Sequence, residues 1–314
     1  MVTGIILLVV LALLLILGLI PLSPAGMTSA PAPAESYEQA IDRFEAIEQE
    51  EQGIVNDLTG SRLLEHGRAT QRAYVLVHGI TNSPDQWVEL GQTLYDKGHN
   101  VLILRMPYHG LRSGEVSELK RLTGPDLRAY ADQAIDIAAG LGDEIVVAGI
   151  SGGGAVAAWA AVNRPEVDRA LLLAPFFGIK GVPGFANTFL MNAFSRLPNL
   201  SFDSPNEPRR EWVYRGEASR GVAAFLGLGH RVQQAARTSI IPNVEIIVIT
   251  TAIDNTANNN VTAALLEEWK QAGVRVMNFE FGAEQEILHN SIDPAADPIK
   301  KQIVYDRMLS LLGE

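Results

Sequence analysis

The chain has 314 residues, of which 47% are hydrophobic and 19% charged, and its formal net charge is −11. This composition is typical of a globular protein, and an acidic chain without a basic stripe argues against nucleic acid as a partner. The sequence contains no cysteine. Disulfides, zinc–thiolate sites and a cysteine nucleophile are therefore excluded.

The N-terminus is an apolar segment set apart from the rest. Residues 4–22 carry no charged side chain, and their number is close to the roughly 20 apolar residues that a helix needs to cross a bilayer. We therefore expect residues 1–22 to form a transmembrane anchor, with the body of the chain outside the cytoplasm. A cleaved secretory signal is the alternative, because Ala-x-Ala patterns follow within residues 30–34, and the body would then be secreted. A buried core helix is the third interpretation.

A short linking segment follows the apolar one. Residues 23–36 are rich in proline and alanine, a composition typical of a semi-rigid tether. Apolar side chains at helical spacing then predict a helix over residues 37–51. We expect residues 37–314 to form one domain.

Strands and helices alternate through this domain. Apolar runs that predict strands occupy residues 73–79, 100–107, 144–149, 168–175, 243–250 and 274–281, and helical patterns occupy residues 85–98, 125–142, 152–163, 261–273 and 298–312. Strands that are apolar along their whole length and alternate with helices indicate an α/β fold with a mostly parallel sheet covered on both faces. Residues 176–240 interrupt the alternation without a clear strand, which predicts an inserted cap.

One glycine-rich turn carries a lone serine. Residues 149–153 read Gly-Ile-Ser-Gly-Gly, which fits G-x-S-x-G with a predicted strand before it and a helix after it. In that context the serine, Ser151, sits on a strained strand-to-helix turn and projects freely as a nucleophile. We expect Gly149 and Gly153 to leave space for the turn and Gly154 to allow close helix packing. A glycine-rich turn that serves packing alone is the competing interpretation.

A serine nucleophile needs a base, and the base needs an acid that orients it. In such a turn the partners follow in the order serine, acid, histidine, each after a strand end. Asp254 follows the strand predicted at 243–250, and His289 is the only histidine after it. Asp293 is the alternative acid. The stretch that begins at Asp254 does not fit a calcium loop, because it lacks the required glycine and the final glutamate, and no metal is predicted.

Two backbone N–H groups are candidates for an oxyanion hole. One belongs to Gly152, directly after the serine, and the other to Ile80 in the His-Gly-Ile-Thr stretch that follows the first strand of the alternation. We expect His78 to be a structural loop residue. His109, in the loop after the next strand, either shapes that loop or contacts substrate.

Together these stretches resemble the α/β-hydrolase superfamily, with the closest likeness to carboxylesterases and monoacylglycerol-lipase-like enzymes. The resemblance rests on LVHGITNSPDQW, VLILRMPYHGLRSG, GISGGG, DNTANN and LHNSIDP, and it covers about residues 60–312. It implies hydrolysis of carboxylic esters without a cofactor, with Ser151 as nucleophile, Asp254 as acid, His289 as base, and Ile80 and Gly152 as oxyanion donors. The segment before His289 lacks the glycine or proline often found beside that histidine.

The substrate is a small-molecule or lipid ester on this interpretation, and the membrane is a partner through the N-terminal segment. Phe185, Phe189 and Phe194 fall near one face of a predicted cap helix, either as an acyl pocket over Ser151 or as that helix's own core face. A non-catalytic protein that binds an apolar ligand, and a thioesterase, peptidase or haloperoxidase on the same triad, are the alternatives.

Overall fold

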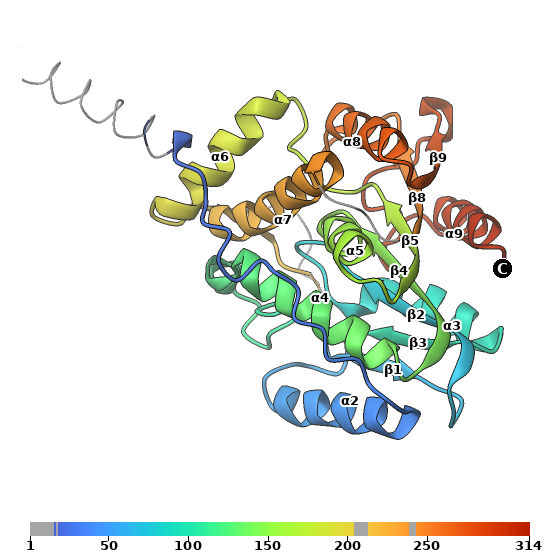
Figure 1. Ribbon diagram of the computed structural model, residues 1–314. Coiled ribbons are helices and arrows are strands. Elements are labelled where there is room, and N and C mark those ends of the chain that lie inside the picture. Colours follow the sequence, from blue (N-terminus) through green and yellow to red (C-terminus); the bar gives the residue numbers. More distant parts are fainter. Residues whose placement is uncertain (1–15, 17, 204–212, 239–242) are drawn as a thin grey trace, which may run out of the picture.

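A seven-stranded, mostly parallel sheet forms the centre of the molecule (Figure 1). The computed structural model describes residues 16, 18–203, 213–238 and 243–314. The strand order is β1-β3-β2-β4-β5-β8-β9, and only β1 is antiparallel to its neighbour. The strands are β1 (Arg62–Leu64), β2 (Thr70–Val77), β3 (Asn100–Ile103), β4 (Gly142–Ile150), β5 (Val167–Leu173), β8 (Glu245–Thr251) and β9 (Arg275–Phe281).

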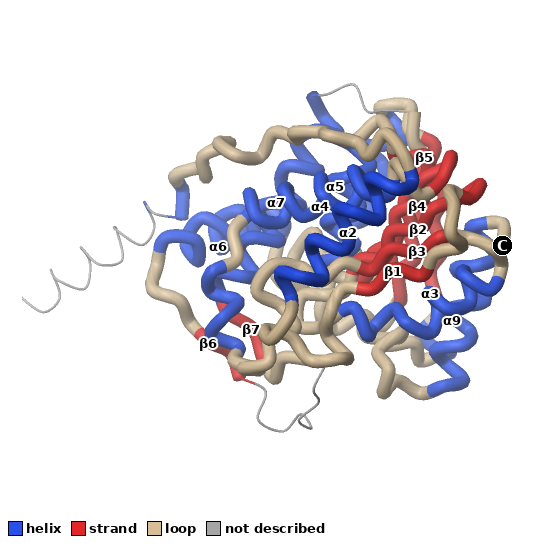
Figure 2. The backbone as a smooth tube through the Cα atoms, turned by 90° about the horizontal axis from the view of Figure 1, so that it is seen from below, coloured by secondary structure: helices blue, strands red, loops and turns tan. Residues whose placement is uncertain are grey.

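Helices cover both faces of this sheet, because its strands are apolar on both sides. Along β2, Ala73, Val75 and Val77 belong to the core on one face, whereas Tyr74 and Leu76 belong to the core on the other. The helices are α2 (Tyr37–Glu51), α3 (Val88–Asp96), α4 (Gly124–Ala138), α5 (Gly152–Asn163), α8 (Asn259–Gln271) and α9 (Pro298–Leu312). Figure 2 shows α3 and α9 on one side of the sheet and α2, α4 and α5 on the other.

The predicted α/β-hydrolase architecture is confirmed, and all six predicted strands are present. The second of them is shorter than predicted, since β3 ends at Ile103 and the chain then turns towards Pro107, which has no N–H for a ladder. No sequence pattern indicated β1, which has only three residues. Strands this short carry too few side chains for a period-2 pattern to stand out.

The cap lies between β5 and β8 and contains more than helices. Helix α6 (Gly184–Arg196) and the 20-residue helix α7 (Ser219–Thr238) flank a pair of short antiparallel strands, β6 (Ser201–Asp203) and β7 (Gly216–Ala218). The expectation that this region contains no strand was therefore wrong, because β6 and β7 form a two-stranded sheet there. In Figure 1, α7 lies between α5 and α6, and it contacts both helices.

The predicted tether is held against the domain, and we call residues 21–36 the strap. Arg128 on α4 donates to the Gly26 carbonyl at 3.0 Å. Two carboxylates of the same helix, Asp132 and Asp136, accept from strap N–H groups, each at 3.0 Å. Both carboxylates also pair with Arg164, whose side chain is fully buried. The strap is therefore fixed to α4 by charge-assisted hydrogen bonds.

The predicted membrane anchor falls largely on residues that the structure does not describe, namely 1–15 and 17. Within the described part of the chain, no helix has both the length and the apolar character needed to cross a membrane.

Candidate active site

Ser151 occupies a strained turn between β4 and α5. Its backbone has φ 55° and ψ −119°, a combination that a residue with a side chain rarely adopts. Surrounding hydrogen bonds hold it there: the Ser151 N–H donates to the Leu173 carbonyl at 2.9 Å, and its own carbonyl accepts from Phe176 at the same distance. The Ser151 side chain is 6% exposed. Strain of this kind, kept by flanking structure, is common at functional sites.

The neighbouring glycines are needed because other chain segments approach them closely. A Cβ atom on Gly149 would lie 2.1 Å from the Gly153 carbonyl oxygen, and one on Gly153 would lie 2.1 Å from the Val77 carbonyl oxygen. A Cβ atom on Gly154 would lie 3.0 Å from Pro175. These contacts agree with the expected roles, which were space for the turn at the first two positions and close helix packing at the third.

Asp254 and His289 meet at the same edge of the sheet. Asp254 follows β8, and its Oδ2 lies 2.8 Å from Nδ1 of His289. Its Oδ1 accepts from the N–H groups of Thr256 and Ala257, each at 2.8 Å. Burial alone would raise the pKa of Asp254, but the hydrogen bond and charge of His289 and the two N–H groups outweigh it and hold that pKa below its ordinary value. Asp254 is therefore ionised at neutral pH.

The other ring nitrogen of His289, Nε2, is not used in any hydrogen bond within the described chain. The His289 side chain is 4% exposed, and its Nε2 has no hydrogen-bond partner among the described residues. Asp254 accepts at Nδ1, so Nδ1 carries a proton and Nε2 of the neutral ring can receive one. Asp293, the alternative acid, instead accepts from Asn82 at 3.1 Å and from the Ala295 N–H at 2.9 Å.

The loop after β2 lies directly beside Ser151. Val77 is paired with Gly149 across β2 and β4, so both strands end at the same level. A Cβ atom on Gly79 would lie 3.7 Å from the Ser151 Cβ, and one on Gly152 would lie 2.5 Å from Ile80 Cγ1. The Ile80 N–H makes no hydrogen bond within the described chain, and Gly152 is the first residue of α5, where helix N–H groups lack an internal partner. Both N–H groups are therefore open to a ligand.

Three buried side chains fix this loop. Gln86 accepts from the Gly79 N–H at 2.8 Å. His78 accepts from the Met106 N–H at Nε2, so its Nδ1 carries the proton and donates to the Gly79 carbonyl at 3.0 Å. His109 Nε2 lies 2.6 Å from the Ile80 carbonyl oxygen. The loop is thus held by Gln86, which follows it in the chain, and by His109 from the loop after β3.

His109 shapes this loop and has no free nitrogen for a substrate. It is fully buried, and its Nδ1 lies 2.8 Å from the Pro107 carbonyl oxygen. Burial lowers the pKa of His109 to about 4, although its two carbonyl contacts act in the opposite direction. The ring is therefore neutral at pH 7 and donates one hydrogen bond, to Ile80 at the shorter distance. Burial also lowers the pKa of His78, which lies edge-on to His109.

The structure does not bring the predicted aromatic contacts together with Ser151. Phe185 is 83% exposed and lines a surface depression with His230 and Arg237. Phe189 lies against Gly18, since a Cβ atom there would be 2.0 Å from its ring. The buried residues of α6 are instead Asn187, Met191, Asn192 and Ala193. Phe194, the third aromatic residue, is half-buried, and its ring centroid lies 6.4 Å from that of Phe202 on β6. The predicted aromatic face of α6 is therefore divided between solvent, the N-terminal segment at Gly18 and β6.

A cap residue that the sequence did not indicate lies near His289. Glu217, on β7, is half-buried; desolvation of its carboxyl group raises its pKa, and the charge of His289 lowers that pKa by less. No described residue hydrogen-bonds to it. The chain enters β7 through Tyr214, whose N–H donates to the Thr81 carbonyl at 2.8 Å, so this strand is tied to the loop after β2. Nothing in the polar stretch around Glu217 distinguishes it from a surface residue.

The described residues contain no group of three or more His, Cys, Asp or Glu side chains that could hold a metal ion. The serine on the strained turn, the buried Asp–His pair and the parallel sheet that carries both define the class of protein. Residues 74–298 match the model of the alpha/beta hydrolase family, and the chain belongs to that family. No curated protein sequence shows significant similarity to it.

Solved structures with the same fold include enzymes that act on lipids. One belongs to a study of LipS and LipT, two metagenome-derived lipolytic enzymes; it has 17% identity and a TM-score of 0.58, with 82% of this chain and 98% of that chain covered. The monoacylglycerol lipase of Paleococcus ferrophilus has 17% identity and a TM-score of 0.56, with 80% and 97% covered. The monoglyceride lipase of Saccharomyces cerevisiae has 11% identity and a TM-score of 0.55, with 81% and 90% covered. At these identities the likeness establishes the fold.

Proposed function

We propose that the protein is a serine hydrolase that cleaves carboxylic esters through an acyl-enzyme on Ser151. The observation that supports this most is the buried His289, which is fixed by Asp254 at Nδ1 and unpartnered at Nε2, at the sheet edge that also carries the strained serine. Lipolytic enzymes and monoacylglycerol lipases share this fold, which agrees with an ester substrate.

In the first half of the reaction, Ser151 Oγ attacks the ester carbonyl carbon while Nε2 of His289 takes the hydroxyl proton. The oxyanion is stabilised by the N–H groups of Ile80 and Gly152, and Asp254 stabilises the imidazolium. The imidazolium then gives its proton to the departing alkoxide, which leaves as the alcohol. In the second half, water attacks the acyl-enzyme with His289 again as base, and the acid is released.

A fluorophosphonate probe tests the nucleophile. We expect the wild type to be labelled and Ser151→Ala to lose labelling, because phosphonylation needs an activated serine. Ser83→Ala is a matched control, since Ser83 is also fully buried but has an ordinary extended φ of −140°. Equal labelling of the wild type and Ser151→Ala would refute the assignment.

A series of p-nitrophenyl esters with increasing acyl length tests the substrate class. Turnover that rises towards long chains would indicate a lipase-like enzyme, and a preference for acetate or butyrate would indicate a short-chain carboxylesterase. A labelled protein that hydrolyses none of the esters would contradict the proposed ester specificity while leaving the nucleophile in place.

A further inference from the structure

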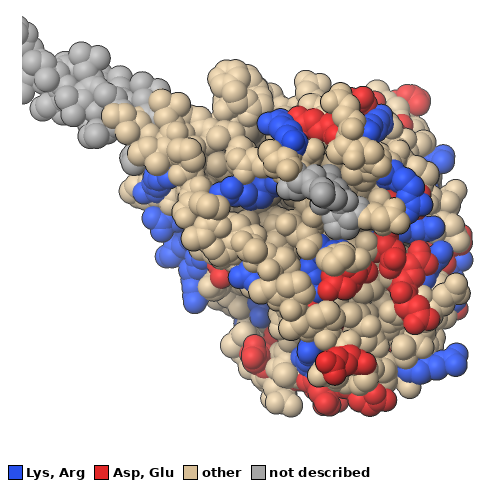
Figure 3. Space-filling view, viewed as in Figure 1, with Lys and Arg blue, Asp and Glu red and all other residues tan. Residues whose placement is uncertain are grey.

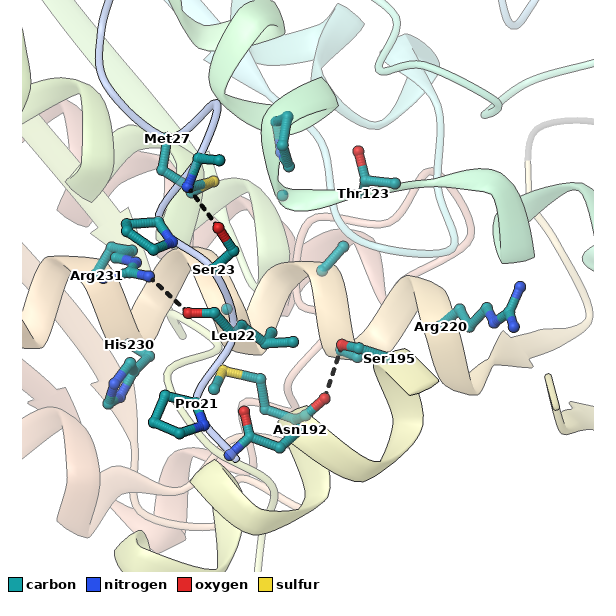
Figure 4. A pocket seen from close by; sticks show the side chains of 18 of the residues that line it. Pro21, Leu22, Ser23, Met27, Thr123, Asn192, Ser195, Arg220, His230 and Arg231 are labelled. Atoms are coloured by element: carbon teal, nitrogen blue, oxygen red, sulfur yellow. Dashed lines mark hydrogen bonds between the residues drawn. The ribbon is translucent and has the colours of Figure 1, made fainter. Parts of the chain in front are cut away.

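A second site lies on the far side of α7 from Ser151. A cavity of about 1060 Å³ is bounded by the strap, α6, α7 and residues 120–125 (Figure 4), and we call it the strap groove. Its apolar wall includes Leu22, Met27, Leu122, Met191 and Ala224. This volume is slightly above the roughly 300–1,000 Å³ typical of small-molecule sites.

Helix α7 separates the strap groove from the candidate active site. Phe225 on this helix lies against the strained turn that carries Ser151, because a Cβ atom on Gly152 would be 2.8 Å from the Phe225 ring. Gly227, His230 and Arg231 on the same helix line the strap groove. None of the groove's lining residues is a member of the Ser151 site. The groove is therefore a separate place for a ligand.

The charge of the strap groove has one sign. Its lining residues include Lys120, Arg121, Arg220 and Arg231 and no Asp or Glu, although the whole chain has a net charge of −11. Arg121 pairs with Glu118 outside the groove, whereas the other three have no acidic partner in the described part of the chain. Figure 3 shows a group of Lys and Arg side chains along the left edge of the molecule, with acidic side chains mainly at the right and bottom of the same face. An apolar groove with a cationic rim complements an anionic amphiphile.

The strap groove also holds an unused polar group. Asn192 is 2% exposed and donates from Nδ2 to the Gly18 carbonyl at 2.8 Å. Its Oδ1 has no hydrogen-bond partner among the described residues. A buried acceptor without a partner costs free energy, and a hydroxyl group of a ligand would supply the missing hydrogen bond.

We propose that the strap groove binds one anionic single-chain amphiphile, with its acyl chain against the wall of α6, α7 and the strap, and its head group at the cationic rim. The inference does not rest on the proposed catalytic function. The Asn192 acceptor favours a head group that carries hydroxyls as well as negative charge, as in lysophosphatidylglycerol.

Isothermal titration calorimetry on the full chain tests this proposal. Dodecanoate and lysophosphatidylglycerol are titrated below their micelle concentrations, and dodecyltrimethylammonium serves as the cationic control with the same chain. We expect either anion to bind and the cation to bind at least about tenfold more weakly, because the rim repels it. The tighter of the two anions identifies the head group. Failure of both anions to bind, or equal binding of the cation, overturns the proposal.

Two variants locate the ligand. Gly227 has room for a side chain, since an added Cβ would lie 3.8 Å from Met191 Sδ and 3.9 Å from Leu22, so Gly227→Leu fills the groove. We expect it to weaken anion binding by about tenfold or more, because the chain loses its apolar contact. The double variant Lys120→Gln/Arg220→Gln is expected to weaken anion binding by roughly five- to tenfold.

Arg237→Gln is the matched control for the charge variant. Arg237 is also on α7 but pairs with Glu268 and lies outside the strap groove, so its loss should leave binding unchanged. Circular dichroism and the melting temperature confirm that each variant is folded. Undiminished binding in both the filled and the charge-depleted variants would place the ligand elsewhere and overturn the proposal.

Discussion

The carboxyl edge of the sheet and the cap above it hold their polar groups in different ways. At the edge, Asp254 and His78 have their side-chain polar atoms engaged by named backbone or side-chain partners, and His109 donates to the Ile80 carbonyl. In the cap, the half-buried carboxyl group of Glu217 has no such partner among the described residues, and α6 presents Phe185 to solvent. A fixed edge suits chemistry that depends on geometry, whereas unpartnered cap groups are suited to contact with a ligand.

The largest expected effect comes from loosening the edge at its acid. Asp254→Asn keeps the shape of the side chain but removes the charge that orients and stabilises the His289 ring. We expect kcat for a p-nitrophenyl ester to fall by on the order of 10³–10⁴, the effect that loss of the acid has in Ser-His-Asp enzymes. Steady-state kinetics at pH 7.5 measure it.

Asp293→Asn is the comparison for that variant, because Asp293 is the other buried acid close in sequence to His289 and hydrogen-bonds to Asn82. The kcat of this variant should fall by less than about tenfold, because the Asp254 carboxylate that pairs with His289 keeps its charge. A larger loss in Asp293→Asn than in Asp254→Asn would reverse the assignment of the acid.

A second, smaller effect should be a loss of folding stability at acidic pH, caused by the buried histidines at the sheet edge. The pKa of His109 is about 4 in the folded protein, against about 6.5 for an unperturbed histidine. Between these values the unfolded chain binds more protons than the folded one, so the free energy of unfolding decreases as the pH falls from about 6.5 to 4. The contribution of His109 to this decrease is up to about 3 kcal/mol.

Urea denaturation at several pH values measures this slope. His109→Gln should reduce it, and the part that remains belongs to His78, whose pKa is also lowered by burial, and to carboxylates with a lowered pKa such as Asp254. His230→Gln is the control: burial lowers the pKa of His230 too, but that side chain is partly exposed, so the change in slope should be smaller. Identical slopes in the wild type and His109→Gln would contradict the neutral, buried state of this ring.

The edge was predictable because its signals are local. Strands that carry Ser151, Asp254 and Ile80 are continuous apolar runs, and the glycines around the serine report a backbone conformation directly. The cap was not, because β6 and β7 have three residues each and are recognised only by their pairing. Docking of the strap depends on contacts such as Arg128 with Gly26, 102 positions apart. Periodicity on α6 predicted an aromatic face but could not say which surface that face meets.

The smallest expected effect tests whether the cap acts on the chemistry at all. Because burial raises the pKa of Glu217, its carboxyl group ionises at a higher pH than usual, and the resulting negative charge near His289 favours the imidazolium formed during catalysis. Glu217→Gln should therefore lower kcat/KM by roughly three- to tenfold at pH 8–9. The difference from the wild type should shrink as the pH is lowered, because the wild-type carboxyl then becomes protonated and loses its charge. A pH–rate profile measures both.

Glu118→Gln controls for a general change of charge, because Glu118 is an acid on the cap side of the molecule that pairs with Arg121. A loss that is the same at every pH would mean that Glu217 acts by packing, and the cap would then have no electrostatic part in the reaction.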